Sequence, residues 1–101
     1  MYYLYILQSK IKDKFYIGYS SDPWKRLIEH NTVPHLTFTS KYRPWELAVV
    51  FEVGNSKKKA TSIERFIKKQ KSISLINKLI DPRFKPTGIL AQLVRVPHVR
   101  D

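Results

Sequence analysis

The chain has 101 residues, which is enough for one small domain, and 43% of them are apolar and can supply its core. Nineteen Lys and Arg oppose eight Asp and Glu, so the net charge is +11, and this excess favours an anionic partner, nucleic acid ahead of a membrane surface. The absence of cysteine excludes disulfides and thiolate metal sites.

The composition also bears on where the protein works. The first ten residues, MYYLYILQSK, have no basic region ahead of their apolar run, and the run is too short and too rich in tyrosine for a signal peptide. No stretch approaches the ~18 to 20 apolar residues of a membrane span. We therefore expect a soluble, cytoplasmic protein that does not bind membranes.

Two short strands are predicted at the start of the chain. Residues 1–8 form an aromatic and β-branched run that is typical of a buried or half-buried strand, and residues 15–19 form a second one. The polar residues 10–14 between them predict a turn. The two strands are therefore expected to pair as an antiparallel hairpin.

A helix is predicted next. Asp22 can cap its first amides, and Pro23 is tolerated at the first helical position. Trp24, Leu27 and Ile28 recur at i, i+3 and i+4, which predicts that they form the buried stripe. The helix is expected to end near residue 31, and residues 32–45 are expected to be irregular.

The rest of the chain contributes one more strand and two more helices. Residues 45–53 (WELAVVFEV) predict a central strand, residues 57–71 a second helix, and a third helix is expected to end near residue 80. The fold class is thus α+β, with a small three-stranded antiparallel sheet flanked by about three helices. Beyond residue 81 the apolar residues follow neither the helical nor the strand period. We therefore expect a domain over residues 1–81 and an irregular or mobile tail over residues 82–101.

Several polar side chains are brought together by this plan. Tyr5 lies on the first strand, and Tyr16 lies on the strand that pairs with it. Arg26 and His30 stand at i and i+4 on the first helix and share a face. Glu64 is the only acid between residues 57 and 71, a segment otherwise rich in lysine.

These residues resemble the GIY-YIG nuclease superfamily, and the resemblance is strongest to its small stand-alone bacterial members, which are related to the N-terminal nuclease domain of the UvrC repair subunit. The match extends from about residue 2 to residue 80. Tyr3 stands where the motif name has glycine, which is a departure. The residues that carry the resemblance are Leu4–Tyr5–Ile6, Phe15–Tyr16–Ile17–Gly18, Arg26, His30–Asn31 and Glu64.

The resemblance implies a role for each of these positions. Tyr16 would deprotonate the attacking water, and Tyr5 would orient the water or the phosphate. Arg26 would neutralise charge on the phosphoryl oxygens, and His30 would hydrogen-bond the tyrosine pair. Glu64 would be the single protein ligand of Mg²⁺ or Mn²⁺, since Mg²⁺ prefers oxygen ligands and keeps several waters.

Further residues are predicted to contact nucleic acid. Gly18 would permit close backbone approach at the end of its strand. Cationic side chains could follow the phosphate backbone, and the irregular loop combines charge with the aromatic ring of Trp45, which suits stacking on a base. These cationic residues are Lys41, Arg43, Lys57, Lys58 and Lys68.

Each residue of the constellation also has a purely structural interpretation. Tyr5 and Tyr16 could be a cross-strand aromatic pair, and Arg26 could be a solvated helix residue. His30 could sit near the negative end of the helix dipole. Glu64 could be the i, i+4 partner of a lysine. Trp45 could belong to the core.

The leading hypothesis is therefore a metal-dependent DNA endonuclease, acting as a monomer or weak homodimer on branched, damaged or single-stranded DNA in repair or recombination. The alternatives are a non-catalytic nucleic-acid-binding module and an interaction domain of a repair complex. The endonuclease and the binding module both predict a steep dependence of DNA binding on salt. Only cleavage measured with and without Mg²⁺ therefore separates these two hypotheses.

Overall fold

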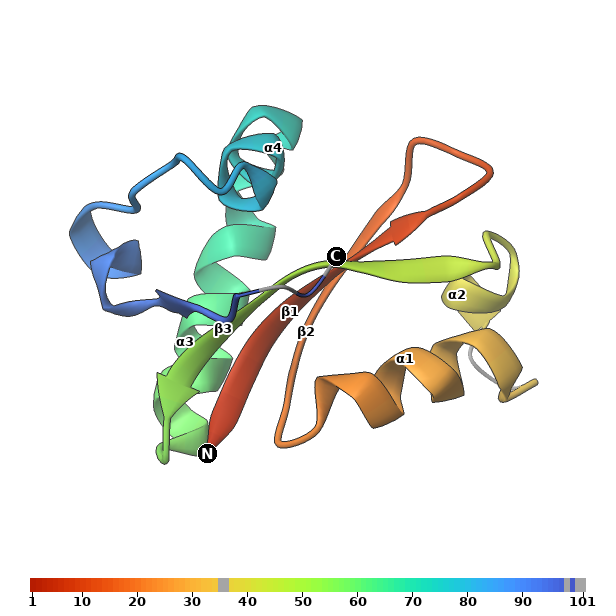
Figure 1. Ribbon diagram of the computed structural model, residues 1–101, viewed down its shortest axis with the longest axis horizontal. Helices are drawn as coiled ribbons and strands as arrows, with labels where there is room; N and C mark the ends of the chain where they lie inside the picture. Colours follow the sequence, from red (N-terminus) through yellow and green to blue (C-terminus); the bar gives the residue numbers. More distant parts are fainter. Residues whose placement is uncertain (35–36, 98, 100–101) are drawn as a thin grey trace.

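The computed structural model describes residues 1–34, 37–97 and 99 and contains a four-stranded antiparallel sheet with helices on both faces (Figure 1). The strands lie in the order β2-β1-β3-β4. Their bounds are β1 Tyr2–Ser9, β2 Phe15–Ser20, β3 Trp45–Gly54 and β4 Val94–Arg95. The helices are α1 Pro23–Thr32, α2 Thr37–Ser40, α3 Lys57–Gln70, α4 Ile73–Ile80 and the 3₁₀ helix η1 Gly88–Gln92.

The hairpin of β1 and β2 is formed as predicted, and its register sets the position of the tyrosines. β1 pairs with β2 on one side and with β3 on the other, so residues 4–7 are at most 1% exposed. Gly18 lies opposite Tyr5, and Tyr16 lies opposite Leu7. β2 has no partner on its outer side in the described sheet, so Tyr16 stands at a free edge.

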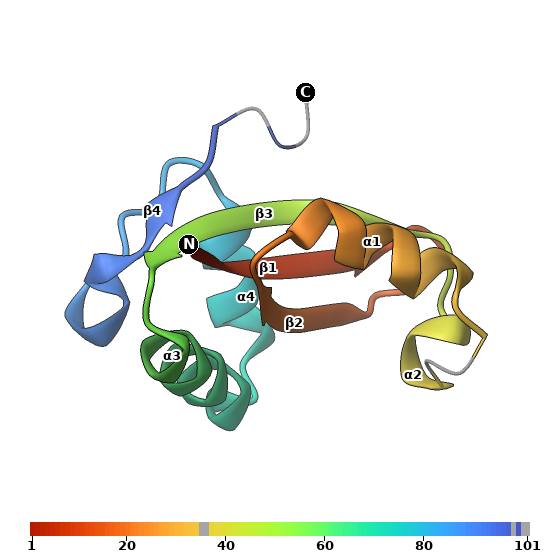
Figure 2. The same ribbon diagram turned by 90° about the horizontal axis from the view of Figure 1, so that it is seen from below.

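The two faces of the sheet bury separate apolar clusters. Leu4 and Ile6 point to one face and pack with Ala60, Ile63 and Leu79 of α3 and α4. Tyr5, Leu7, Trp45, Leu47 and Val50 point to the other face, which α1 covers. Figure 2 shows this division, with α1 on one side of the sheet and α3 and α4 on the other.

A side-chain cap begins each of the three longer helices, and the cap at Asp22 is the one predicted above. A side-chain oxygen of Asp22 accepts from the Lys25 amide at 3.0 Å, and Pro23 follows as the first helical residue. Ser56 and Ser72 cap α3 and α4 in the same manner. Each cap satisfies an amide that the helix itself leaves without an acceptor.

The predicted buried face of α1 is wrong. Trp24 and Ile28 are 45% and 63% exposed, and the buried residues of this helix are instead Pro23 and His30. Leu27 packs partly on the sheet. The helix is therefore rotated so that a polar face, and not its most apolar one, meets the sheet.

The prediction of three strands and an irregular tail over residues 82–101 also needs correction. Residues 94–95 form β4, which pairs with β3 and adds a fourth strand. Leu90 and Leu93 are each 6% exposed and belong to the core beneath α3 and α4. Burial of these two leucines offsets the entropy lost on ordering the segment. Residues 98, 100 and 101 of the predicted tail lie outside the described residues.

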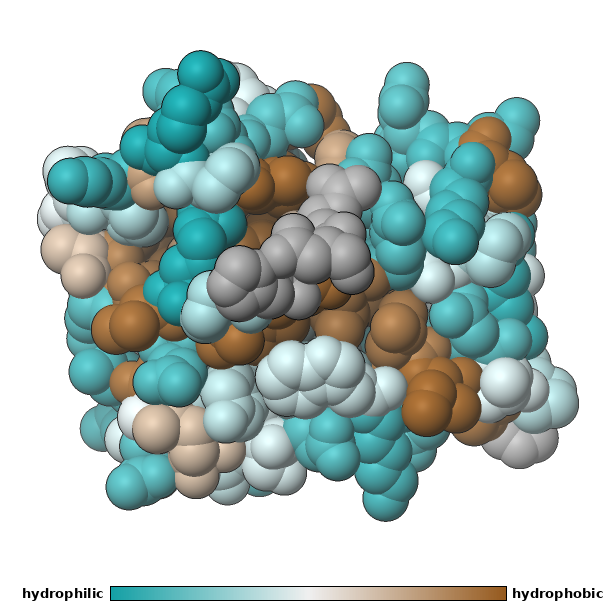
Figure 3. Space-filling view, in the orientation of Figure 1, coloured by the Kyte–Doolittle hydropathy of each residue, from teal (hydrophilic) through white to brown (hydrophobic). Residues whose placement is uncertain are grey.

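The face of the molecule that carries the C-terminal segment has both apolar and hydrophilic residues on its surface. Apolar residues gather across the middle of the face in Figure 3, between hydrophilic side chains at its two ends. Within the part of the chain that the structure describes, no helix has both the length and the apolar character needed to cross a membrane.

Candidate active site

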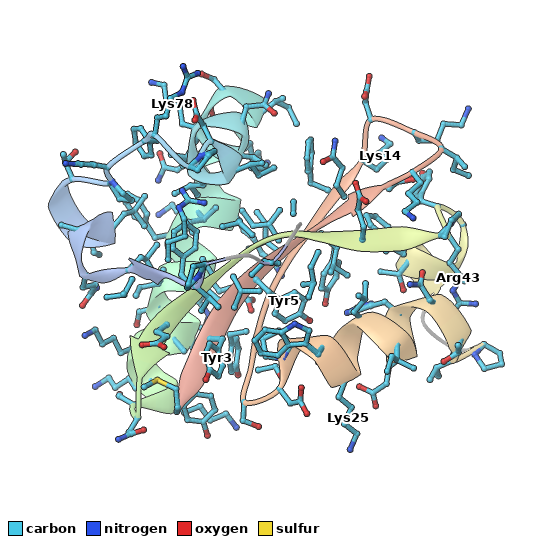
Figure 4. The ribbon with its side chains drawn as sticks, viewed as in Figure 1. Tyr3, Tyr5, Lys14, Lys25, Arg43 and Lys78 are labelled. Carbon is cyan, nitrogen blue, oxygen red and sulfur yellow. The ribbon has the colours of Figure 1, made fainter. Side chains whose placement is uncertain are left out.

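The two predicted tyrosines lie next to each other on β1 and β2. Their ring centroids are 6.3 Å apart. The Tyr5 side chain is 1% exposed and projects from the sheet toward α1 (Figure 4), whereas Tyr16 is half-buried at the sheet edge. A Cβ atom on Gly18 would lie 2.6 Å from the Tyr5 hydroxyl oxygen, so the absence of a side chain there makes room for the Tyr5 ring.

His30 of α1 completes an aromatic cluster with these tyrosines. Its Nε2 is 3.2 Å from the Tyr5 hydroxyl oxygen, and its ring centroid is 4.5 Å from that of Tyr16. His30 is 1% exposed, and its Nδ1 has no hydrogen-bond partner among the described residues. The polar face of α1 is thus turned inward because it supplies the partner that the buried Tyr5 hydroxyl requires.

Arg26 lies one turn before His30 on the same face of α1. Its guanidinium hydrogen-bonds the Tyr5 hydroxyl, and its Nη1 donates to the Glu29 carboxylate at 3.0 Å. The Arg26 and Glu29 side chains are each 33% exposed, so the guanidinium remains open to solvent on one side. Because arginine only donates, the Tyr5 oxygen accepts from Arg26 and its own proton is available to Nε2 of His30.

Burial sets the protonation states of this cluster. Burial raises the pKa of Tyr5 to about 12, although its hydrogen bond with Arg26 acts in the opposite direction. Burial also lowers the pKa of His30 to about 4, and the nearby positive charge of Arg26 contributes. Burial lowers the pKa of Arg26, but its bonds to Tyr5 and Glu29 outweigh that effect and raise it overall. Near pH 7 Tyr5 and His30 are therefore both neutral.

α3 brings the predicted carboxylate to the same edge of the sheet. Glu64 is 16% exposed on its side chain, and Nζ of Lys68 lies 3.1 Å from its Oε1. The same ammonium lies 5.6 Å from the centre of the Tyr16 ring. The negative charge of Glu64 contributes to the raised pKa of Tyr5. Although α3 covers the opposite face of the sheet, Lys68 reaches the Tyr16 ring around the free edge of β2, and Glu64 is paired with Lys68 there.

Glu64 would supply a single carboxylate to a divalent cation at this edge. The Glu64 carboxylate already holds one cation, the Lys68 ammonium, beside the Tyr16 ring. Among the described residues, no group of three or more His, Cys, Asp or Glu side chains could surround an ion. A cation bound here would therefore depend on Glu64, water and substrate oxygens, a donor set that suits Mg²⁺.

The residues predicted to contact nucleic acid are placed differently from one another. Lys41, Lys57 and Lys58 are exposed, the last two at the start of α3. Arg43 is occupied elsewhere: its Nε donates to the His30 carbonyl at 2.6 Å, and its Nη2 donates to the Val33 carbonyl. Figure 4 shows Arg43 beside the end of α1. Arg43 thus satisfies carbonyls that the helix leaves open.

Trp45 belongs to the core, which confirms its structural interpretation. It is 2% exposed, and its indole Nε1 donates to the Thr39 carbonyl at 2.7 Å. The structural interpretation of Glu64 as a partner of Lys68 is also correct, because that ion pair forms. For Glu64 the two interpretations are compatible.

The sequence reasoning missed Glu29, and it named Asn31 without predicting what that residue contacts. Glu29 pairs with Arg26 at i, i+3, a spacing that was visible in the sequence. Asn31 bonds both the amide and the carbonyl of Trp45, at 2.7 and 3.0 Å, and so ties the end of α1 to the start of β3. No local pattern predicts the contact between Asn31 and Trp45, since the two residues are 14 positions apart.

Comparison with known families assigns the chain. Residues 1–77 match the GIY-YIG catalytic domain. The chain belongs to the GIY-YIG family. The match runs from before β1 into α4, and it includes the five predicted site residues Tyr5, Tyr16, Arg26, His30 and Glu64. Membership of this family indicates a nuclease-type domain, and the α+β fold is consistent with it.

The chain is also similar to curated proteins of Streptococcus pyogenes. The chain is 38% identical over 72 residues to a UPF0213 protein of Streptococcus pyogenes serotype M5 (strain Manfredo), which is 71% of this chain and 76% of that protein. UPF0213 proteins of serotype M3 (strain MGAS315) and serotype M2 (strain MGAS10270) share 36% and 38% identity over the same proportions of the two chains.

Proposed function

We propose that this protein is a Mg²⁺- or Mn²⁺-dependent DNA endonuclease that hydrolyses phosphodiester bonds, with DNA repair or recombination as its setting. The observation that supports this most strongly is the cluster of two phenols, a guanidinium and an imidazole from β1, β2 and α1, with the Glu64–Lys68 pair of α3 beside the Tyr16 ring. The net charge of +11 supports an anionic polymer as the substrate.

The environments of the two tyrosines suit different roles. Tyr5 is buried and stays protonated near pH 7, since its pKa is about 12, so it serves as a hydrogen-bond donor and positions its neighbours. Tyr16 stands at the open edge, where water and a phosphate can reach it. This difference supports Tyr16 as the general base and Tyr5 as the orienting group.

The proposed hydrolysis uses Tyr16 and Arg26. The Tyr16 hydroxyl oxygen accepts a proton from the attacking water and the phenol passes its own proton to solvent, while the water oxygen bonds to phosphorus and the ester P–O bond breaks. The leaving oxygen is protonated from solvent. Arg26, open to solvent on one side, donates to the phosphoryl oxygens as their charge grows.

The remaining residues hold these groups in place. His30 is neutral above about pH 4, so it acts by holding the tyrosines and not by adding a positive charge. Glu64 would hold the divalent ion, which supplies Lewis-acid stabilisation of charge on the phosphate and the leaving oxygen. Lys68 would leave Glu64 and pair with substrate phosphate.

The test is cleavage of labelled branched and single-stranded DNA in Mg²⁺ and in EDTA. We expect metal-dependent cleavage, a fall of about 10²- to 10⁴-fold in Tyr16→Phe, and loss of cleavage in Glu64→Gln. Tyr19→Phe on the same strand and Glu52→Gln on β3 are matched controls and should cleave normally.

Two outcomes would overturn the proposal. One is metal-dependent cleavage that survives unchanged in Glu64→Gln and Tyr16→Phe. The other is the absence of cleavage by the wild-type protein together with DNA affinity that falls steeply with salt, which would instead indicate a non-catalytic binding module.

A further inference from the structure

A groove of about 380 Å³ opens beside Tyr16, between β2 and the junction of α3 and α4. We refer to it as the junction groove. It is continuous with the candidate active site, because Tyr16 and Lys68 line both. Its volume lies in the range of pockets that hold small molecules, roughly 300–1,000 Å³. The lining residues are Phe15, Tyr16, Ile17, Ile67, Lys68, Lys71, Ser72, Ile73 and Ile76.

The walls of the junction groove combine two kinds of surface. Phe15, Ile73 and Ile76 provide an aromatic and aliphatic surface, and Ile73 is 57% exposed although it is apolar. Lys68 and Lys71 add two positive charges, and none of the described lining residues is acidic. An apolar surface flanked by ammonium groups is complementary to a nucleotide, which has flat base faces and an anionic phosphate.

The backbone of Lys71 gives an independent indication. Lys71 ends α3 in the left-handed conformation, with φ 49° and ψ 40°, and its amide donates to the Lys68 carbonyl at 3.2 Å. It is the only non-glycine residue with positive φ in the described part of the chain. Glycine usually occupies this position because it has no Cβ to clash. A lysine here keeps a charge at the groove at a cost in backbone strain, as is common at ligand-binding positions.

We propose that the junction groove holds an unstacked base next to the scissile phosphate. This inference rests on the proposed function and narrows its substrate class to nucleic acid with an unpaired nucleotide at the cleavage point, such as a bulge, a branch point or a single strand. A base inside a regular duplex is stacked and paired, so it reaches such a groove only after the energy of unstacking is spent.

Binding measured in EDTA tests the groove apart from cleavage. The probes are a fully paired DNA duplex and the same duplex with one bulged 2-aminopurine, whose fluorescence reports its stacking. We expect the bulged duplex to bind about 10-fold more tightly, within the range that one stacked base contributes. We also expect the 2-aminopurine signal to change on binding.

The variants are chosen so that folding and binding separate. Lys71→Gly relieves the strained backbone, so it should melt at a higher temperature than the wild type and yet lose most of the preference for the bulge. Ile73→Asp should lose the preference as well, because it places a negative charge at the exposed rim. Lys78→Gln is the matched control: Lys78 is exposed on α4 outside the groove and points away from the body of the protein (Figure 4), so this variant should keep the preference.

Equal affinity for the two duplexes, or a preference that persists in both groove variants, would overturn the inference. Failure of this inference can be told apart from failure of the proposed function. Cleavage in Mg²⁺ without any preference for the bulge would refute the groove alone. Preference for the bulge in a protein that never cleaves would refute the nuclease alone.

Discussion

Gly18 gives the sharpest test of how the site is assembled, because the space above it is filled by Tyr5. A Cβ atom at residue 18 would lie 2.6 Å from Oη and 2.7 Å from Cζ of Tyr5, and 3.1 Å from Cε1 of Tyr16. Carbon atoms in contact normally stand about 3.5–4.0 Å apart. In Gly18→Ala the Tyr5 ring therefore has to move by about 1 Å.

The position of Tyr5 makes this displacement costly. The ring is 1% exposed, and its hydroxyl is 3.2 Å from Nε2 of His30 on the far side, so a shift disturbs the bonds to both His30 and Arg26. Overpacking of this kind destabilises a fold by about 1–3 kcal/mol. Misplacing a catalytic group by about 1 Å lowers the rate by about 10²-fold.

The assay compares cleavage rate, DNA affinity and melting temperature in Gly18→Ala and Gly88→Ala. Gly88 has φ +62° and no atom within 4 Å of a Cβ, so alanine there strains the backbone without touching the site. We expect both variants to lose stability and only Gly18→Ala to lose cleavage, with DNA affinity nearly unchanged. Normal cleavage by Gly18→Ala, or an equal loss in Gly88→Ala, would refute the reasoning.

Three further predictions concern stability, each measured by urea unfolding. Because the pKa of His30 falls from 6.5 to about 4 on folding, the unfolded chain binds more protons between these values, and up to about 3 kcal/mol of stability is lost as pH falls from 6.5 to 4. His30→Gln should lack this loss, and an unchanged pH dependence would contradict the assignment. Arg43→Ala should cost about 1–3 kcal/mol through its two carbonyl bonds, whereas exposed Lys41→Ala should cost little; equal costs would argue against a structural Arg43. Leu93→Ala should cost about 2–5 kcal/mol, and a neutral effect would show that the C-terminal segment adds nothing to the core.

Much of the fold could be predicted because its signals are local. The caps at Asp22, Ser56 and Ser72 need only a side chain and an amide three residues later. The long apolar run of β3 predicts a central strand, because such a strand is buried on both faces.

The orientation of α1 could not be predicted from its apolar residues. Trp24, Leu27 and Ile28 form the most hydrophobic face, but the buried hydroxyl of Tyr5 needs hydrogen-bond partners, and Arg26 and His30 provide them from the other face. The requirement to satisfy a buried polar group therefore outweighs the hydrophobic stripe. The contact is between residues 25 positions apart, so no periodicity reveals it.

The C-terminal segment was misread for a similar reason. Prolines and short apolar stretches in residues 82–97 predict no regular element, yet Leu90 and Leu93 fill space that the sheet and α3 leave open. The left-handed conformation of Lys71 could not be predicted either, because no sequence pattern indicates a left-handed backbone at a lysine. By contrast, the resemblance to the GIY-YIG family suggested five site residues, Tyr5, Tyr16, Arg26, His30 and Glu64, and their roles stay predictions.

Paramagnetic broadening by Mn²⁺ in a proton NMR spectrum tests most directly whether Tyr16 and His30 lie close to a metal ion bound at Glu64. With Mn²⁺ bound at the carboxylate of residue 64, the ring signals of Tyr16 and His30 should broaden first, and Glu64→Gln should abolish the effect, with Glu52→Gln behaving as wild type. Broadening centred on another part of the chain, or unchanged in Glu64→Gln, would contradict the account.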